Sequence, residues 1–130
     1  DLVVAFRNVH SWLRSDTLQD VLSAVHTALK PGGTFGVVQH RGKPGMSLED
    51  SKKKGYVAQD EVIKLIEAAG FKLVATSEIN ANPKDQPSAS DIVWRLPPSY
   101  FGTKDDEAKK AAVDVIGESN RMTLVFKKKG

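Results

Sequence analysis

The chain of 130 residues contains no cysteine and no long uninterrupted apolar run. Without cysteine it can form neither disulfides nor thiolate metal sites. A helix that spans a bilayer needs about 20 apolar residues, and no segment approaches that length, so no membrane partner is expected. A secretion signal is absent as well, which makes the cytoplasm the expected location.

An excess of one charge sign is also missing. Nineteen basic residues face sixteen acidic ones, a net charge of +3. Part of the positive charge lies in two lysine clusters, at 52–54 and 127–129, which are typical of solvated surface. Nucleic-acid binding usually requires a larger basic stripe with aromatic residues between the charges, so no nucleic-acid partner is expected.

Strands and helices alternate along the first 79 residues. The apolar run Leu2–Phe6 predicts a strand buried on both faces, as in a parallel sheet. Apolar residues recur at helical spacing over 18–29, where Asp16 is placed to cap the helix and Pro31 to end it. The alternation continues with a strand at 34–39, a helix at 62–69 and a strand at 72–79.

The remaining segments are more polar. Residues 42–55 are rich in Gly, Lys and Ser without periodicity, which predicts a mobile loop. A polar, proline-containing stretch follows at 80–99, and then a short helix at 105–116 and a last strand at Arg121–Lys128. This order predicts one α/β domain over 1–130, whose sheet is mostly parallel with an antiparallel last strand and whose insertion covers about 80–120.

Two junctions carry a resemblance to a known family. Leu29-Lys30-Pro31-Gly32-Gly33 leads from a helix into a strand, and Ala69-Gly70-Phe71 does so again. Together with residues 1–13 and Arg121–Lys128, they resemble the C-terminal half of a class I S-adenosylmethionine-dependent methyltransferase, nearest to a bacterial group of predicted small methyltransferases. The resemblance implies a partial Rossmann-like sheet that holds the fourth to seventh strands of the family, and a small-molecule substrate.

The family's glycine-rich cofactor loop, and the acidic residue that holds the ribose, have no counterpart in these residues. The resemblance therefore implies S-adenosylmethionine as the cofactor of a complete parent protein, and weak or no cofactor binding by this fragment, which we expect to be inactive alone. Two alternatives stay open: a non-enzymatic, self-associating half-domain, and a different α/β nucleotide-binding domain. In the first, the unpaired strand Leu2–Phe6 would pair with a second copy, giving a homodimer.

Ligands of open α/β sheets bind beyond the carboxyl ends of the strands. Arg7, Asn8, His10 and Trp12 follow the first strand. Asn8 can orient a nucleophile, and His10 can act as a general base near neutral pH. The resemblance places Arg7 and Asn8 near the cofactor, and Arg7 and Trp12 near the substrate. The alternative is that Asn8 closes a turn and His10 packs on Trp12.

Two further clusters follow later strands. His40 can share the role of base, and Arg41 can bind an anionic substrate group, unless the two are an ordinary surface pair at a strand end. Asn80 is a candidate substrate contact or a turn residue. Trp94 either caps the substrate or covers an exposed face of the sheet. No metal is expected, because the histidine spacing fits no standard zinc pattern.

Overall fold

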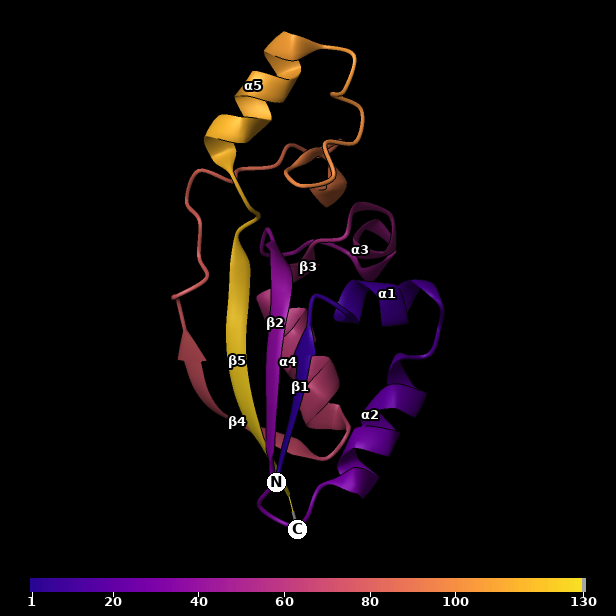
Figure 1. The fold of residues 1–130 in the computed structure, drawn as a ribbon. Coiled ribbons are helices and arrows are strands. Elements are labelled where there is room, and N and C mark those ends of the chain that lie inside the picture. The colour runs from indigo at the N-terminus through magenta and orange to yellow at the C-terminus, as the bar shows by residue number, and fades with distance from the viewer. Residues whose placement is uncertain (130) are drawn as a thin grey trace.

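The computed structural model describes residues 1–129, in which one sheet is combined with helices (Figure 1). Its strands are β1 (Leu2–Phe6), β2 (Thr34–Gly42), β3 (Val57–Ala58), β4 (Phe71–Ser77) and β5 (Arg121–Lys128). Its helices are α1 (Val9–Arg14), α2 (Leu18–Ala28), α3 (Leu48–Lys54), α4 (Gln59–Ala68) and α5 (Glu107–Ile116), with a 3₁₀ turn η1 at Val93–Arg95.

The main path of the sheet runs β1-β2-β5-β4, and β3 pairs with the end of β2. β1 and β2 are parallel, whereas β5 is antiparallel to both β2 and β4. β4 therefore runs in the same direction as β1 and β2. The predicted α/β fold with an antiparallel last strand is confirmed, and β5 lies between β2 and β4 although it is last in the sequence.

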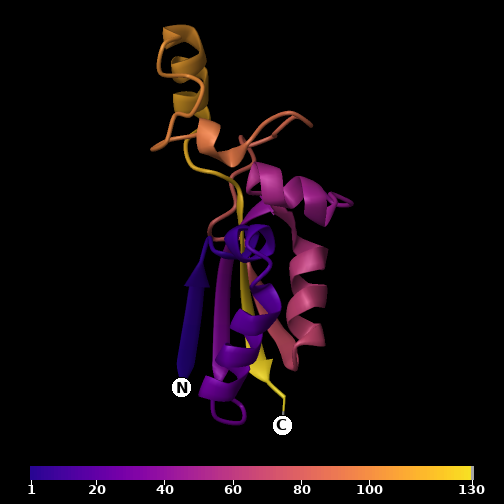
Figure 2. The ribbon, with the colours of Figure 1, turned by 90° about the vertical axis from the view of Figure 1, so that its right-hand side faces the viewer.

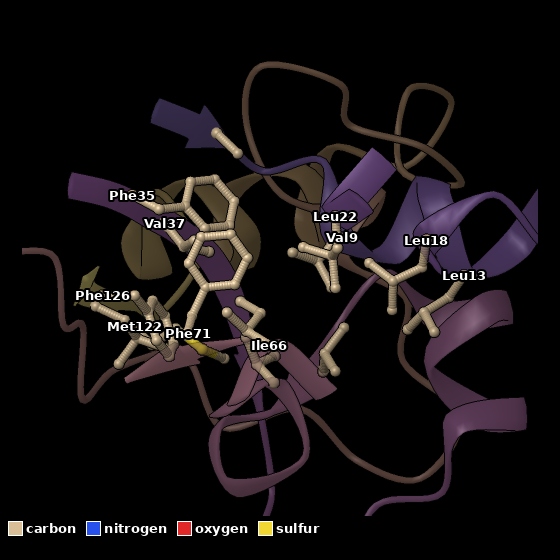
Figure 3. Close-up of a cluster of buried hydrophobic side chains, with 14 of the residues drawn as sticks. Val9, Leu13, Leu18, Leu22, Phe35, Val37, Ile66, Phe71, Met122 and Phe126 are labelled. Atoms are coloured by element: carbon tan, nitrogen blue, oxygen red, sulfur yellow. The ribbon is translucent and has the colours of Figure 1, made fainter. Parts of the chain in front are cut away.

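One face of the sheet carries the core. Side chains alternate along a strand, and every second residue of β2 and β5 is buried, including Phe35, Val37 and Phe126. The Phe35 ring lies 5.4 Å from that of Phe71 and 6.4 Å from that of Phe126. Helices α2 and α4 add Leu22, Val62 and Ile66 to the same cluster (Figure 3). Both helices pack on one side of the sheet (Figure 2).

The opposite face is bare at β1. Leu2, Val4 and Phe6 are 66%, 49% and 57% exposed, and Ala5 is the one buried residue of the strand. The prediction that Leu2–Phe6 is buried on both faces is therefore wrong. β1 lies at the edge of the sheet, and within residues 1–129 its outer face has no helix against it. An apolar run shows that a strand is suited to burial. Whether it is buried depends on which other elements pack against it.

Two local predictions are corrected. Residues 42–55 were expected to form a mobile loop, but they contain helix α3, whose first turn is capped by the Ser47 hydroxyl accepting from the Asp50 N–H. Gly55 ends α3 in the left-handed conformation, with φ 81°. Asp16 does not cap α2, because Thr17 occupies the N-cap position and makes no side-chain capping bond.

The segment between β4 and β5 covers the carboxyl end of the sheet, and α5 projects away from it (Figure 1). The segment is anchored by the buried Asp85 carboxylate. This group accepts hydrogen bonds from the Tyr56 hydroxyl at 2.9 Å, from Arg95 Nη2 at 3.1 Å and from the Asn120 N–H at 3.0 Å. One carboxylate thus ties both ends of the segment to the start of β3.

The one-sided core predicts unequal effects of truncation on the two faces. Phe35→Ala should lower the free energy of unfolding by about 3–5 kcal/mol, because it leaves a cavity among packed rings. Val4→Ala, on the bare face, should lower it by less than about 1 kcal/mol. Urea unfolding of both variants measures the difference, and equal losses would show that the bare face is packed in solution.

Candidate functional site

A pocket of about 320 Å³ lies where β1 and β2 end and β5 begins. Four of the predicted site residues line it: Arg7 after β1, His10 in α1, His40 in β2, and Trp94 in η1. The other lining residues are Phe6, Val93, Leu96, Pro97, Pro98, Ser99, Ser119 and Arg121. The strand ends and α1 thus supply the charged and imidazole groups, and the segment between β4 and β5 supplies most of the apolar wall.

The two histidine rings lie next to each other in the lining of this pocket. Their ring centroids are 5.5 Å apart, and the Trp94 ring stands edge-on to His10 at 5.6 Å. His10 lies at the start of the short helix α1, so its ring is fixed by the turn that leaves β1. His40 lies in β2, opposite Arg121 in the β2–β5 ladder.

Gln39 sets the protonation of His10. Its amide is fully buried in β2 and is oriented by the backbone: Oε1 accepts from the Val9 N–H at 3.1 Å, and Nε2 donates to the Gly55 carbonyl at 3.0 Å. Nε2 also lies 3.1 Å from His10 Nδ1. Gln39 Oε1 is more distant from the same nitrogen, at 3.4 Å. The shorter contact favours donation by Gln39 Nε2 to Nδ1, which places the proton of neutral His10 on its own Nε2.

Ser119 does the same for His40. The Ser119 hydroxyl oxygen accepts from Arg121 Nε at 3.1 Å and is also bonded to His40 Nδ1. Within residues 1–129 its hydrogen has no other acceptor, so it donates to Nδ1 and leaves the proton of His40 on Nε2. Both imidazoles therefore keep an N–H donor on the nitrogen away from its buried partner.

Burial keeps both rings neutral. It lowers the pKa of His40 from 6.5 to about 3, and the nearby positive charges of Arg121 and Arg7 act in the same direction. The pKa of His10 is also lowered, mainly by burial and further by Arg14. A group that resists protonation so strongly is a weak general base. The geometry favours hydrogen-bond donation by His10 and His40 over the predicted role of base.

The other predicted site residues lie outside the pocket. Asn8 is exposed at the start of α1 without a capping bond, and Trp12 is half-buried against the core. The Arg41 guanidinium is bound to both oxygens of Glu78, at 3.2 and 2.8 Å. The Asn80 amide donates to the Thr123 hydroxyl. The structure brings none of them to the two histidines.

Sequence reasoning missed Gln39 as a member of the site. Its signal was present, since a glutamine in the otherwise apolar strand 34–39 must find buried partners.

Trp94 also lines a second hollow of about 660 Å³, shared with Lys52 and Lys53 among others, and the Arg14 guanidinium lies 5.0 Å from its ring. Trp94 therefore lines two hollows, and its role in capping a substrate stays a prediction.

No protein-family profile matches the chain, and no curated protein does. Solved structures do. The [4+2]-cyclase SpnF matches with a TM-score of 0.55 and 16% identity, over 99% of this chain and 49% of that chain. A chain of the complex between the Haloferax volcanii Trm112 methyltransferase activator and a candidate methyltransferase matches with a TM-score of 0.55 and 15% identity, over 100% of this chain and 54% of that one.

These similarities establish the class of fold, a methyltransferase-like α/β fold, and at such low identity they establish the fold alone. The chain spans about half the length of the solved structures it matches. None of the helices in residues 1–129 has the length and apolar character needed to cross a bilayer. The same residues contain no group of three or more His, Asp or Glu side chains arranged to hold a metal ion.

The buried, neutral histidines predict a loss of stability in mild acid. Below pH 6.5 the unfolded chain binds protons that folded His40 refuses until about pH 3, so stability falls as the pH falls through this window. Between pH 6.5 and about 5, the loss from His40 should be on the order of 1 to 2 kcal/mol. His40→Asn, whose amide can still reach Ser119, should remove this part.

Urea unfolding of wild type and His40→Asn at the two pH values measures the effect. Above about pH 5 most carboxylates are still ionised, so the histidines dominate the change. Equal losses in the two proteins would mean that His40 is not held neutral by the fold.

Proposed function

We propose that this chain is part of an S-adenosylmethionine-dependent methyltransferase acting on a small molecule, and that it forms the substrate side of the active site. The observation that carries the proposal is the sheet order, in which antiparallel β5 lies between two strands of the opposite direction, with a pocket at their carboxyl ends. In this proposal β1, β2, β4 and β5 correspond to the fourth, fifth, sixth and seventh strands of the family, in one domain with an insertion at about 80–120.

The pocket itself does not fit the cofactor. S-adenosylmethionine carries a positive sulfonium, whereas the pocket is lined by Arg7 and Arg121, and none of its lining residues has a carboxylate. Like charges brought together in a partly buried site repel each other. The chain also lacks a glycine-rich loop after a strand that could approach the cofactor closely. We therefore assign the pocket to the substrate. Asn8, which does not line the pocket, stays a proposed cofactor contact, whereas the same repulsion argues against that role for Arg7.

The chain's own residues would bind and orient the substrate. Methyl transfer depends mainly on alignment of the reacting atoms and exclusion of water. Trp94, Leu96 and Pro97 supply an apolar wall that excludes water, and the imidazoles of His10 and His40 supply fixed donors. Trp12, Arg41 and Asn80 stay predictions as substrate contacts, without support from their surroundings.

The cofactor proposal is tested by isothermal titration with S-adenosylhomocysteine. The protein as its gene encodes it should bind near the micromolar level, about −8 kcal/mol, whereas the 130 residues alone should bind more weakly than about 1 mM. Micromolar binding by the 130 residues alone would contradict our assignment of the pocket. Absence of binding by the complete gene product would contradict the proposed function.

A second candidate is a self-associating, non-enzymatic unit, and the bare face of β1 favours it. The outer edge of β1 has no strand beside it within residues 1–129, and its exposed side chains are apolar. An unpaired apolar edge strand is a template for pairing with another chain. A two-fold dimer through this edge, with a standard interface of about 1,600 Å², would cover it.

Charge placed on this edge should prevent such a dimer. Light scattering of the 130 residues should give twice the mass of one chain, and Val4→Lys should shift it to one chain. Val115→Lys is the matched control, since Val115 is also exposed, at 72%, but lies on α5 far from β1 (Figure 1). A monomeric wild type at all concentrations, or equal effects of both variants, would rule out the β1 interface.

A further inference from the structure

We infer that the pocket recognises an anionic group, a carboxylate or a phosphate, on a small molecule with an apolar body, through Arg7, Arg121 and the N–H groups of His10 and His40. To call this molecule the substrate rests on the proposed function. The recognition of an anion rests on the pocket alone.

The charge of the pocket is one-sided. Two guanidinium groups and no carboxylate line its 320 Å³. The Arg7 side chain makes no hydrogen bond or ion pair within residues 1–129, and its backbone is held at φ 62° by the turn that leaves β1. Arg7 thus brings a cation to the pocket that the described part of the chain does not neutralise.

Arg121 is only partly engaged. Its Nε donates to Ser119, and its Nη1 lies 3.4 Å from Glu118, a long contact to a carboxylate that is 68% exposed. Exposed ion pairs contribute little, so Glu118 neutralises Arg121 weakly. The side chain of Arg121 is itself 15% exposed, and its Nη2 has no partner within residues 1–129. A planar group with a spare N–H beside a second arginine suits an anion with two or more oxygens.

The histidines add donors and no acceptors. Gln39 and Ser119 occupy Nδ1 of His10 and His40, which leaves the N–H at Nε2 of each ring without a partner within residues 1–129. An anion could accept from these groups, whereas a cation or a hydrogen-bond donor would find no complement there. Arg41 shows the contrast, because its guanidinium already donates to Gln59 and Asn120 as well as to both oxygens of Glu78.

The apolar part of the lining indicates the size and character of the remainder of the ligand. Phe6, Val93, Trp94 and Leu96 line the same pocket, whose volume lies at the small end of the range for organic ligands. These side chains offer an apolar surface beside the cations, against which the body of a ligand can pack. The pocket is therefore suited to a molecule about the size of one aromatic ring that bears one anionic group.

The test uses three ring compounds that differ in charge: benzoate, phenyl phosphate and the neutral benzamide. Binding to the 130-residue chain is followed by NMR of the histidine rings. Benzoate or phenyl phosphate should shift the His10 and His40 signals and raise the pKa of His40. Benzamide should bind at least about tenfold more weakly, the loss of one charge-assisted contact. Whichever anion binds better identifies the group, and either preference supports the inference.

Two variants and a control locate the site. Arg121→Gln and Arg7→Asn should each weaken anion binding about tenfold or more, and asparagine tolerates the positive φ of position 7. Lys72→Gln removes an exposed cation from β4, outside the pocket, and should leave anion binding unchanged. Circular dichroism checks that Arg121→Gln folds, and Arg7→Asn decides the matter if it does not.

Equal binding of benzamide and benzoate would overturn the inference, as would unchanged anion binding in Arg7→Asn together with folded Arg121→Gln. Failure of this inference can be told apart from failure of the proposed function. Methyl transfer by the complete gene product to neutral substrates only would overturn the assignment of the anion as the substrate and leave the function standing. Anion binding by a gene product without affinity for S-adenosylhomocysteine would overturn the function and leave the anion site standing.

Discussion

The buried amide of Gln39 in β2 constrains everything at the carboxyl end of the sheet. An unsatisfied amide in an apolar interior costs about 1–3 kcal/mol, so its donors and acceptor must find partners. They are the Val9 N–H and His10 Nδ1, both in α1, and the Gly55 carbonyl at the end of α3, while Gln39 itself lies in β2. The amide therefore joins three segments that are distant in sequence, and it fixes which nitrogen of His10 faces the ligand.

The core lies on one face of the sheet only, so the other face is left open at β1. Helices α2 and α4 bury one face of the sheet, so the aromatic cluster around Phe35 carries the stability of the fold. The other face at β1 retains apolar side chains that no described residue covers. The same strand ends in Phe6 and Arg7, which line the pocket. A partner placed against β1 would therefore lie next to the candidate site, whether it is a second copy or the rest of a larger fold.

Local patterns predicted what depends on local sequence. β1 and β5 begin and end where their apolar patterns do, and β5 is antiparallel as expected. Helix α3 was missed because capping and end charges stabilise it rather than an apolar stripe. The exposure of β1 depends on absent neighbours. The neutrality of His40 depends on its burial and on the positive charge of Arg121 in β5, and the engagement of Arg41 depends on Glu78, so neither can be derived from spacing along the chain.

The chemistry open to the pocket follows from its lack of acceptors. A general base needs a free lone pair and a pKa near the working pH. Neither histidine offers one, because each Nδ1 is engaged and burial holds His40 at a pKa of about 3. The pocket is therefore better suited to hold and orient a molecule than to remove a proton from it. A reacting group placed here must either carry a lone pair already free at neutral pH or lose its proton to a group outside the pocket.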